Sequence, residues 1–346
     1  MKSIHSFRKR AKRWLDWNIE SHRVIVICMA VPRKIQVITA FAALYLIWGS
    51  TYLAILFAIQ SIPPFLMAGS RFLLAGLILF AIARTQGPLR STSAEWRTAF
   101  IVGACLLLGG NGGVTLSEKF IESGLASLIV ATVPIYITLL GWLFGMSPRP
   151  TSIVWLGLAG GFLGVAILLG PALRFSSASG SHPAIGMSIL LLSSFIWSAG
   201  SLYSRKAKYT ASPFLGAAQQ MFCGGLLLTI VGLFVGEPKH FHPGNITTLS
   251  LGAFAYLVLI GAIVGYTAYF WLLRHCDPAK VATYAYVNPI VAVLLGALFA
   301  HETVTLRTLL AAALIIGSVA LIITVQQLKT RTLPPITAAI ETDCAR

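Results

Sequence analysis

Apolar stretches of about 20 residues follow one another along this chain, and they restrict its fold more than any other feature. An α-helix rises 1.5 Å per residue, so each stretch can cross a hydrocarbon core of about 30 Å. The residues are 57% apolar and 10% charged, against about 45–50% and about 25% in soluble domains. We therefore predict an all-α polytopic membrane protein. Ten spans are expected, at 37–59, 64–84, 98–117, 123–145, 152–173, 184–203, 213–234, 250–273, 279–300 and 306–327.

Basic residues predict the orientation, because Lys and Arg in short loops stay on the cytoplasmic side. With the N-terminus inside, most of the 26 Lys and Arg residues lie on the inner side. We therefore place both termini in the cytoplasm of a bacterium and the chain in its inner membrane. The net charge of +16 is interleaved with apolar runs, so it does not indicate a nucleic-acid partner. The outer loops then hold only Lys119, Arg174, Lys239 and Arg307.

Residues 1–35 form a basic segment before the first expected span. They carry nine Lys and Arg residues against two acidic ones, and their apolar run at 24–31 is too short to cross a bilayer. We expect this segment to lie on the cytoplasmic surface against anionic lipid. The alternative is that Met29 is the true start. Residues 328–346 are expected to form a cytoplasmic tail.

Two blocks of sequence recur within the chain. Shifting Tyr284–Phe299 back by 155 positions places Pro289 on Pro134, and shifting by 149 places Trp197 on Trp48. This register indicates a duplication into repeats at 36–173 and 184–327, each with five spans. Because five is odd, the second repeat enters the membrane from the opposite side. Inverted repeats recur in secondary transporters, which hold their substrate near the midplane and work by alternating access.

Several of these motifs also resemble a known family. The stretches LYLIWGSTYLAI, PPFLMAGSRFLLAG, GGNGGVTLSEKFIESGLASLIVATVPIY and ATYAYVNPIVAVLLG are similar to the EamA family of the drug/metabolite transporter superfamily, and in combination to its YedA-type exporters. The resemblance covers residues 36–327. It implies a ten-helix permease with cytoplasmic termini that exports metabolites, amino acids or drugs.

Polar and aromatic side chains within the spans are candidates for a substrate site, because polar groups in hydrocarbon usually face the interior. Asn288 precedes Pro289, which frees a carbonyl of the preceding turn, and aromatic rings can stack on flat solutes. The alternatives are amides that satisfy their own helix and rings that anchor at the membrane interface. The candidates are Trp48, Tyr52, Asn111, Trp197, Tyr203, Tyr266, Tyr284 and Asn288. Glycines such as Gly157, Gly161 and Gly164 indicate close helix packing instead.

Three charged residues are candidates for gating. Arg71 lies about 12 Å into its span by helical rise, so its guanidinium needs a partner. We expect a pair with Glu118 as part of an outer gate, and Glu302 is the other candidate partner. The alternative is that the long Arg71 side chain snorkels to the outer surface.

The absence of certain charged residues and motifs restricts the possible functions of the chain. No Asp or Glu lies near the midplane of a span, which favours neutral, zwitterionic or modestly amphipathic solutes over polyvalent cations. The five cysteines show no metal-ligand spacing, and no GxSxG, HExxH or Walker A motif occurs. We expect no cofactor, no metal and no enzymatic activity. The expected partners are a small-molecule substrate and the bilayer, and the architecture allows a homodimer. An intramembrane enzyme, a channel and a scaffold are the alternatives.

Overall fold

The computed structural model describes residues 33–147, 149–175, 183–207, 212–276, 281 and 283–332. Within these residues the secondary structure is helical, with no strand. The chain is therefore an all-helical protein, as predicted. Residues 1–32, which hold most of the expected basic segment and Met29, and residues 333–346 of the expected tail lie outside the described residues.

Eight helices of the described residues are long and apolar enough to cross a membrane. Two further apolar helices, Ser152–Ile167 and Val287–Phe299, are shorter. The long ones make this a multi-pass membrane protein. They are Lys34–Ala58, Pro64–Gln86, Ser93–Ser117, Ser123–Leu143, Pro183–Ser204, Phe214–Phe234, Thr248–Tyr269 and Leu306–Val325.

The first half of the chain, residues 33–175, begins its helices with ordinary start signals. Pro64 is the first residue of its helix, where its missing N–H is not needed. Thr92 and Glu95 form a capping box, in which the Thr92 N–H donates to the Glu95 carboxylate at 2.7 Å. The elements are α2 (Arg33–Ala58), α3 (Pro64–Gln86), α4 (Ser93–Val102), η1 (Gly103–Gly112), α5 (Gly113–Ser117), α6 (Ser123–Val130), α7 (Val133–Leu143) and α8 (Ser152–Phe175).

The second half, residues 183–332, has a similar order of elements. Ser212 caps its second helix by accepting a hydrogen bond from the Leu215 N–H at 3.3 Å. The elements are α9 (Pro183–Lys206), α10 (Pro213–Phe234), the 3₁₀ turns η2 (Glu237–His240) and η3 (Pro243–Asn245), α11 (Thr248–Tyr256), η4 (Leu257–Val264), α12 (Gly265–His275), α14 (Tyr284–Phe299) and α15 (Leu306–Thr332).

Two local features differ from the uniform helices expected from sequence. The segments η1 and η4 are π-helical, and each lies in the middle of a span. Such wider turns are rare and often accompany functional sites. The expected helix 123–145 is divided into α6 and α7, because Pro134 lies in the first turn of α7 and cannot donate to the turn before it. Pro289, in contrast, lies inside the continuous helix α14.

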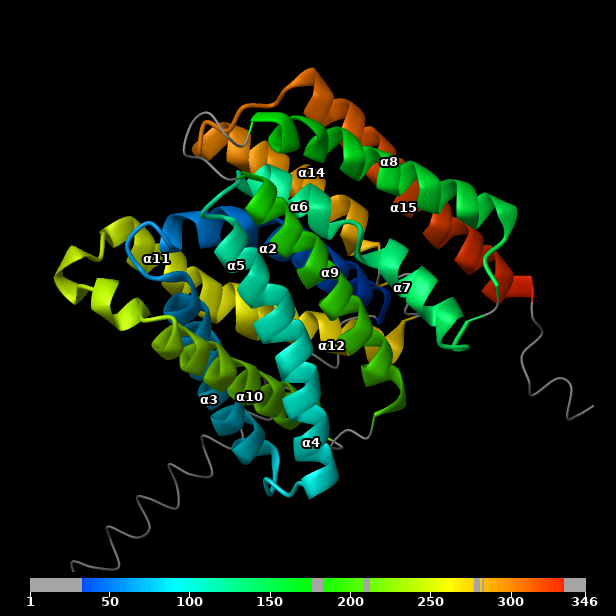
Figure 1. The fold of residues 1–346 in the computed structure, drawn as a ribbon. Coiled ribbons are helices and arrows are strands. Elements are labelled where there is room, and N and C mark those ends of the chain that lie inside the picture. Colours follow the sequence, from blue (N-terminus) through cyan, green and yellow to red (C-terminus); the bar gives the residue numbers. More distant parts are fainter. Residues whose placement is uncertain are drawn as a thin grey trace, which may run out of the picture.

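Close helix contacts at glycines hold two pairs of helices together. A Cβ added at Gly157 would lie 2.8 Å from Ile322 Cγ1, and one at Gly164 would lie 2.7 Å from Ile315 Cγ1, both on α15. The packing interpretation of these glycines is therefore confirmed. Figure 1 shows α8 and α15 side by side along one edge of the bundle, and α3 and α10 side by side along the opposite edge.

The first helix of each half packs mainly against the other half. Helix α2 contacts α14 and the run from α11 to α12, whereas α9 contacts α6, α7 and the run from α4 to α5. The two halves are thus interlocked rather than placed next to each other (Figure 1). Side chains from α2 and α9 consequently meet residues of both halves near the centre of the bundle.

Candidate functional site

A cavity lies where the two halves meet. It is bounded by α2, α3, the run from η1 to α5, α6, α7, α9, the run from η4 to α12, and α14. Its lining residues are Trp48, Thr51, Tyr52, Ile55, Arg71, Phe72, Gly110, Asn111, Val114, Ser127, Val130, Ala131, Val133, Ser193, Ser194, Trp197, Gly261, Ala262, Tyr266, Tyr284, Ala285, Asn288 and Pro289.

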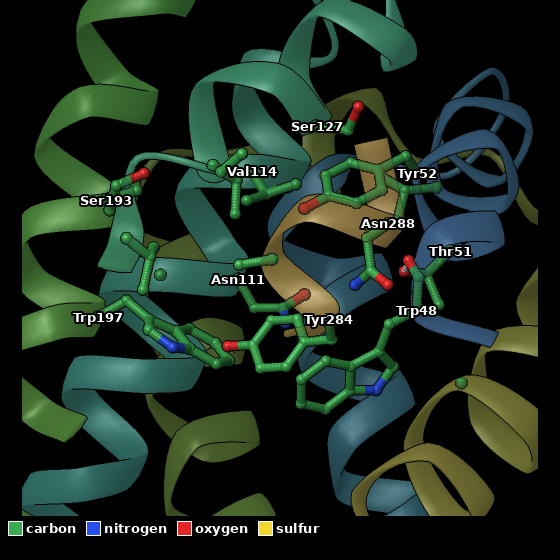
Figure 2. A pocket seen from close by; sticks show the side chains of 18 of the residues that line it. Trp48, Thr51, Tyr52, Asn111, Val114, Ser127, Ser193, Trp197, Tyr284 and Asn288 are labelled. Atoms are coloured by element: carbon green, nitrogen blue, oxygen red, sulfur yellow. Dashed lines mark hydrogen bonds between the residues drawn. The ribbon is translucent and has the colours of Figure 1, made fainter. Parts of the chain in front are cut away.

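A cluster of rings centred on Trp48 forms an aromatic wall of this cavity. The Trp48 ring lies 5.2 Å from that of Tyr284 and 5.5 Å from that of Tyr266, both edge to face. The Trp197 ring is 6.4 Å away at 89°. Figure 2 shows Tyr284 between the two tryptophans. These separations fall in the range that aromatic pairs prefer, so the wall is a packed surface that can receive a flat apolar group.

Each tryptophan of the wall packs on a glycine of the other half. A Cβ at Gly265 in α12 would lie 2.6 Å from Trp48 Nε1, and a Cβ at Gly110 in η1 would lie 2.5 Å from Trp197 Cε3. Neither position therefore accepts a side chain without displacing the ring. The rings lie over the π-helical spans because these glycines leave room for them.

Arg71 contributes a positive charge to the cavity. Its side chain is only 3% exposed, and its Nη2 donates to Asn111 Oδ1 at 2.5 Å. The guanidinium carbon also lies 4.3 Å from the centre of the Phe72 ring. The alternative of snorkelling to the surface is wrong, because the guanidinium is buried beside the cavity.

The expected ion pair between Arg71 and Glu118 is absent from this conformation. Glu118 is 4% exposed, yet neither of its carboxylate oxygens has a hydrogen-bond partner. Glu118 follows Asn111 by seven residues, which is about 10 Å along a helix. The Arg71 side chain therefore reaches the amide and not the carboxylate.

Asn288 places an amide next to an interrupted turn of α14. With its amide oriented to satisfy its neighbours, the nitrogen donates to the carbonyls of Tyr284 and Tyr45, each at 3.2 Å. Pro289 has no N–H to donate to the carbonyl of Ala285, which also lines the cavity. In Figure 2 the Asn288 amide lies near Thr51 and Trp48. The turn offers polar backbone and side-chain groups within a mainly apolar surface.

Most of the residues predicted as a substrate site do line this one cavity. They are Trp48, Tyr52, Asn111, Trp197, Tyr266, Tyr284 and Asn288. Tyr203 does not: it is 37% exposed and lies away from the cavity. It follows Trp197 by six residues, which turns its side chain about 240° around the helix and away from this cavity, so its role in binding stays a prediction.

Sequence reasoning missed the small polar residues of the cavity, which are Thr51, Ser127, Ser193 and Ser194. A hydroxyl in an apolar helix commonly bonds to a carbonyl of its own preceding turn, as Ser127 does to Gly124 at 2.6 Å. Such residues therefore give no signal of their own. Thr51 and Ser193 could have been found by their helical spacing from Trp48 and Trp197, at three and four residues.

Glu302 lies outside the cavity and binds the start of a helix in the other half. Its carboxylate accepts the N–H of Ser123 at 2.6 Å and that of Gly124 at 2.9 Å, at the beginning of α6. Glu237 binds α3 in the same way, through the N–H groups of Phe65 at 3.0 Å and Leu66 at 2.8 Å. Helix N-termini favour negative charge, so both contacts join the halves strongly. Glu237 was not predicted.

Membrane-length helices that surround a central cavity lined by aromatic and amide groups are typical of helical membrane transporters. The chain belongs to the EamA-like transporter family, whose model matches residues 35–170 and again residues 184–324. It is 36% identical over 284 residues to the uncharacterized inner membrane transporter YedA of Escherichia coli K12, which covers 82% of this chain and 89% of that protein. The resemblance predicted from the sequence motifs is confirmed.

More distant similarities agree with this assignment. A probable amino-acid metabolite efflux pump of Escherichia coli K12 is 27% identical over 281 residues, 78% of this chain and 88% of that protein. A solved crystal structure matches with a TM-score of 0.58 at 21% identity, covering 87% of this chain and 100% of that one. The structural match concerns the fold alone. The named relatives are transporters rather than enzymes.

Proposed function

We propose that the protein is a secondary-active or facilitative permease that exports small amphipathic solutes, such as metabolites, amino acids or drug-like compounds, by alternating access. The cavity carries this proposal: it lies between the two halves, and aromatic, amide and hydroxyl groups line it. Pockets that combine an apolar surface with a few convergent polar groups are typical of small-molecule sites. The bilayer and the solute are the proposed partners, and a homodimer stays a prediction.

An inverted repeat supports alternating access, because two equivalent halves can exchange their conformations. Shifted by 149 positions, α2 and α3 fall at 182–207 and 213–235, close to the bounds of α9 and α10. Shifted by 155, η1 falls at 258–267, which overlaps the other π-helical segment η4 at 257–264. The tryptophan contacts follow these shifts as well. Trp48 and Trp197 are related by the shift of 149 and Gly110 and Gly265 by the shift of 155, and Trp48 packs on Gly265 as Trp197 packs on Gly110. With α8 and α14 as further spans, the proposed ten crossings put both termini on one side of the membrane, and the distribution of Lys and Arg favours the cytoplasmic side.

The carboxylate contacts at one end of the bundle are the proposed outer gate. In the proposed orientation, Glu237 and Glu302 lie in outer loops, and each holds a helix of the opposite half. Arg71 and Glu118 remain gate candidates for another conformation, since they form no pair in this one. Opening the outer end requires these cross-half hydrogen bonds to break.

Loss of the aromatic wall tests the proposed site. Cells overexpressing the protein are screened with a panel of metabolites and toxins for growth and efflux, and the same panel is given to Trp48→Ala and Asn288→Ala. Both variants should lose most of any resistance or efflux, because stacking on a ring contributes about 1 kcal/mol and an amide hydrogen bond a similar amount. Trp155→Ala, which changes a tryptophan that is 39% exposed outside the cavity, should behave as wild type.

If both cavity variants export as well as wild type at matched expression, the cavity is not the transport site. Saturable flux in proteoliposomes distinguishes a permease from a channel, whose flux rises in proportion to solute concentration.

A further inference from the structure

A lone positive charge is buried in the wall of the central cavity. Arg71 is the only charged side chain among the described residues that line it. The side chain is 3% exposed, and no carboxylate accepts a hydrogen bond from it. Gln220, which occupies the equivalent position 149 residues later, is uncharged, so the second half supplies no matching charge. An unpaired guanidinium at this depth is unfavourable unless another group compensates its charge.

The hydrogen bonds of the Arg71 guanidinium are incomplete. It can donate five N–H groups in a planar fork. In the described residues its one hydrogen bond goes from Nη2 to the neutral Asn111 amide, and its Nε is buried with no partner. The Phe72 ring adds a weaker attraction through its face. Most of the fork is therefore left for a ligand.

We propose that Arg71 binds the oxyanion of an organic monoanion, and that the apolar body of this solute lies against Trp48, Trp197 and Tyr284. This inference rests on the proposed function and defines the solute class of the same cavity. Guanidinium groups bind carboxylates and other oxyanions through paired N–H groups. The ring of a flat anion can stack on the aromatic wall while its charged end meets Arg71, because both line one cavity.

The charges of the cavity favour a monoanion over a zwitterion or a cation. An ammonium group would need a carboxylate, and none lines the cavity in the described residues. Glu118 is buried, but it lies outside the lining set. A single guanidinium likewise neutralises one negative charge and not two. The inside-negative potential of a bacterial membrane favours outward movement of an anion, which agrees with export.

Binding to the purified protein in nanodiscs tests this inference with probes of one shape and different charge. Phenylacetate, phenylacetamide, phenethylamine and benzylphosphonate are titrated, and the quenching of tryptophan fluorescence is measured. Wild type should bind phenylacetate at least about tenfold more tightly than phenylacetamide, because charge-assisted hydrogen bonds are the strong ones. The benzylphosphonate arm, whose head group carries more than one negative charge near pH 7, tests the preference for a monoanion and should bind more weakly than phenylacetate.

Variants assign this preference to Arg71. Arg71→Gln should reduce the ratio of the two affinities to about one while phenylacetamide still binds, and Arg71→Lys should keep part of the ratio. Asn111→Asp places a carboxylate within hydrogen-bond distance of the guanidinium, so it should abolish phenylacetate binding without removing Arg71. Arg97→Gln, which changes an exposed arginine, should behave as wild type.

Several outcomes would overturn the inference. Wild type could show no saturable binding of phenylacetate, or it could bind phenylacetate and phenylacetamide with equal affinity. An unchanged preference for phenylacetate in Asn111→Asp would also overturn it, and this variant gives the test if Arg71→Gln does not fold. Failure of the proposed function looks different: anion binding would persist in nanodiscs, but no saturable flux would occur in proteoliposomes. Export of solutes without anion preference would refute the monoanion and leave the permease standing.

Discussion

At the scale of single residues, the recurring tryptophans were predictable and the contact of Arg71 was not. Trp48 and Trp197 recur in register within the chain, and both line the cavity. Arg71 and Asn111 are 40 residues apart on different helices. Helical periodicity tells which face of a helix a residue occupies, but it does not tell which face of another helix it meets. Charge alone favoured an acid as the partner of Arg71, whereas the partner in this conformation is the Asn111 amide.

Glu118 gives a prediction at this scale. Its buried carboxylate has no hydrogen-bond partner, so removing the polar group should relieve an unfavourable burial. We expect Glu118→Met to raise the free energy of unfolding by about 1 kcal/mol or more, measured by thermal unfolding in detergent. If transport falls at the same time, the carboxylate is kept for function at the expense of stability. A clear loss of stability would show that this carboxylate has a partner.

At the scale of helices, the bounds of most elements could be predicted from the length of the apolar stretches and from proline and cap residues. The two π-helical segments could not be predicted. Gly103–Gly112 and Leu257–Val264 are as apolar as the helices around them, so nothing in their composition distinguishes their wider turns. The division between α6 and α7 could have been expected from Pro134. The glycines that receive the tryptophan rings could not, because a close approach depends on the neighbouring helix.

Gly110 tests the packing of the aromatic wall on the π-helical spans. A Cβ there would lie 2.5 Å from the Trp197 ring, so Gly110→Ala must displace the ring or the helix. We expect a loss of about 1–3 kcal/mol in the free energy of unfolding, together with weaker solute binding. Gly252→Ala is the matched control: no atom lies within 4 Å of its added Cβ, and a helical Gly→Ala change should stabilise by about 0.5–1 kcal/mol. Equal effects of the two changes would refute the packing role.

Glu302 tests the cross-half contact at the start of α6. Glu302→Gln removes the charge that two backbone N–H groups share, so the proposed outer end should open more readily. We expect the rate at which an impermeant thiol reagent labels a cysteine in the cavity from outside to rise several-fold. Glu122→Gln changes a nearby acid with longer hydrogen bonds to Thr303, of 3.2 and 3.4 Å, and should have a smaller effect. An unchanged rate in Glu302→Gln would mean that this contact is not part of a gate.

At the scale of the whole molecule, the sequence predicted an all-helical membrane protein of this family. The recurring sequence blocks also indicated which parts of the two halves are equivalent. It could not show that each half inserts its first helix into the other, because the order of spans along the chain does not determine their neighbours. That interlocking places residues of both halves around one cavity. The central claim is that this cavity opens to each side of the membrane in turn.

Thiol labelling of the cavity tests this claim most directly. In a background without the native cysteines, Ser193→Cys lies in the cavity, and Leu192→Cys is a control, since Leu192 is 61% exposed on the outside of the bundle. We predict that an impermeant maleimide reacts with Ser193→Cys from either side of oriented vesicles. A bifunctional thiol cross-linker that joins Glu122→Cys to Thr303→Cys, whose native side chains share a hydrogen bond of 3.2 Å, should then block reaction from the outer side only. Reaction from both sides in the cross-linked protein would contradict alternating access.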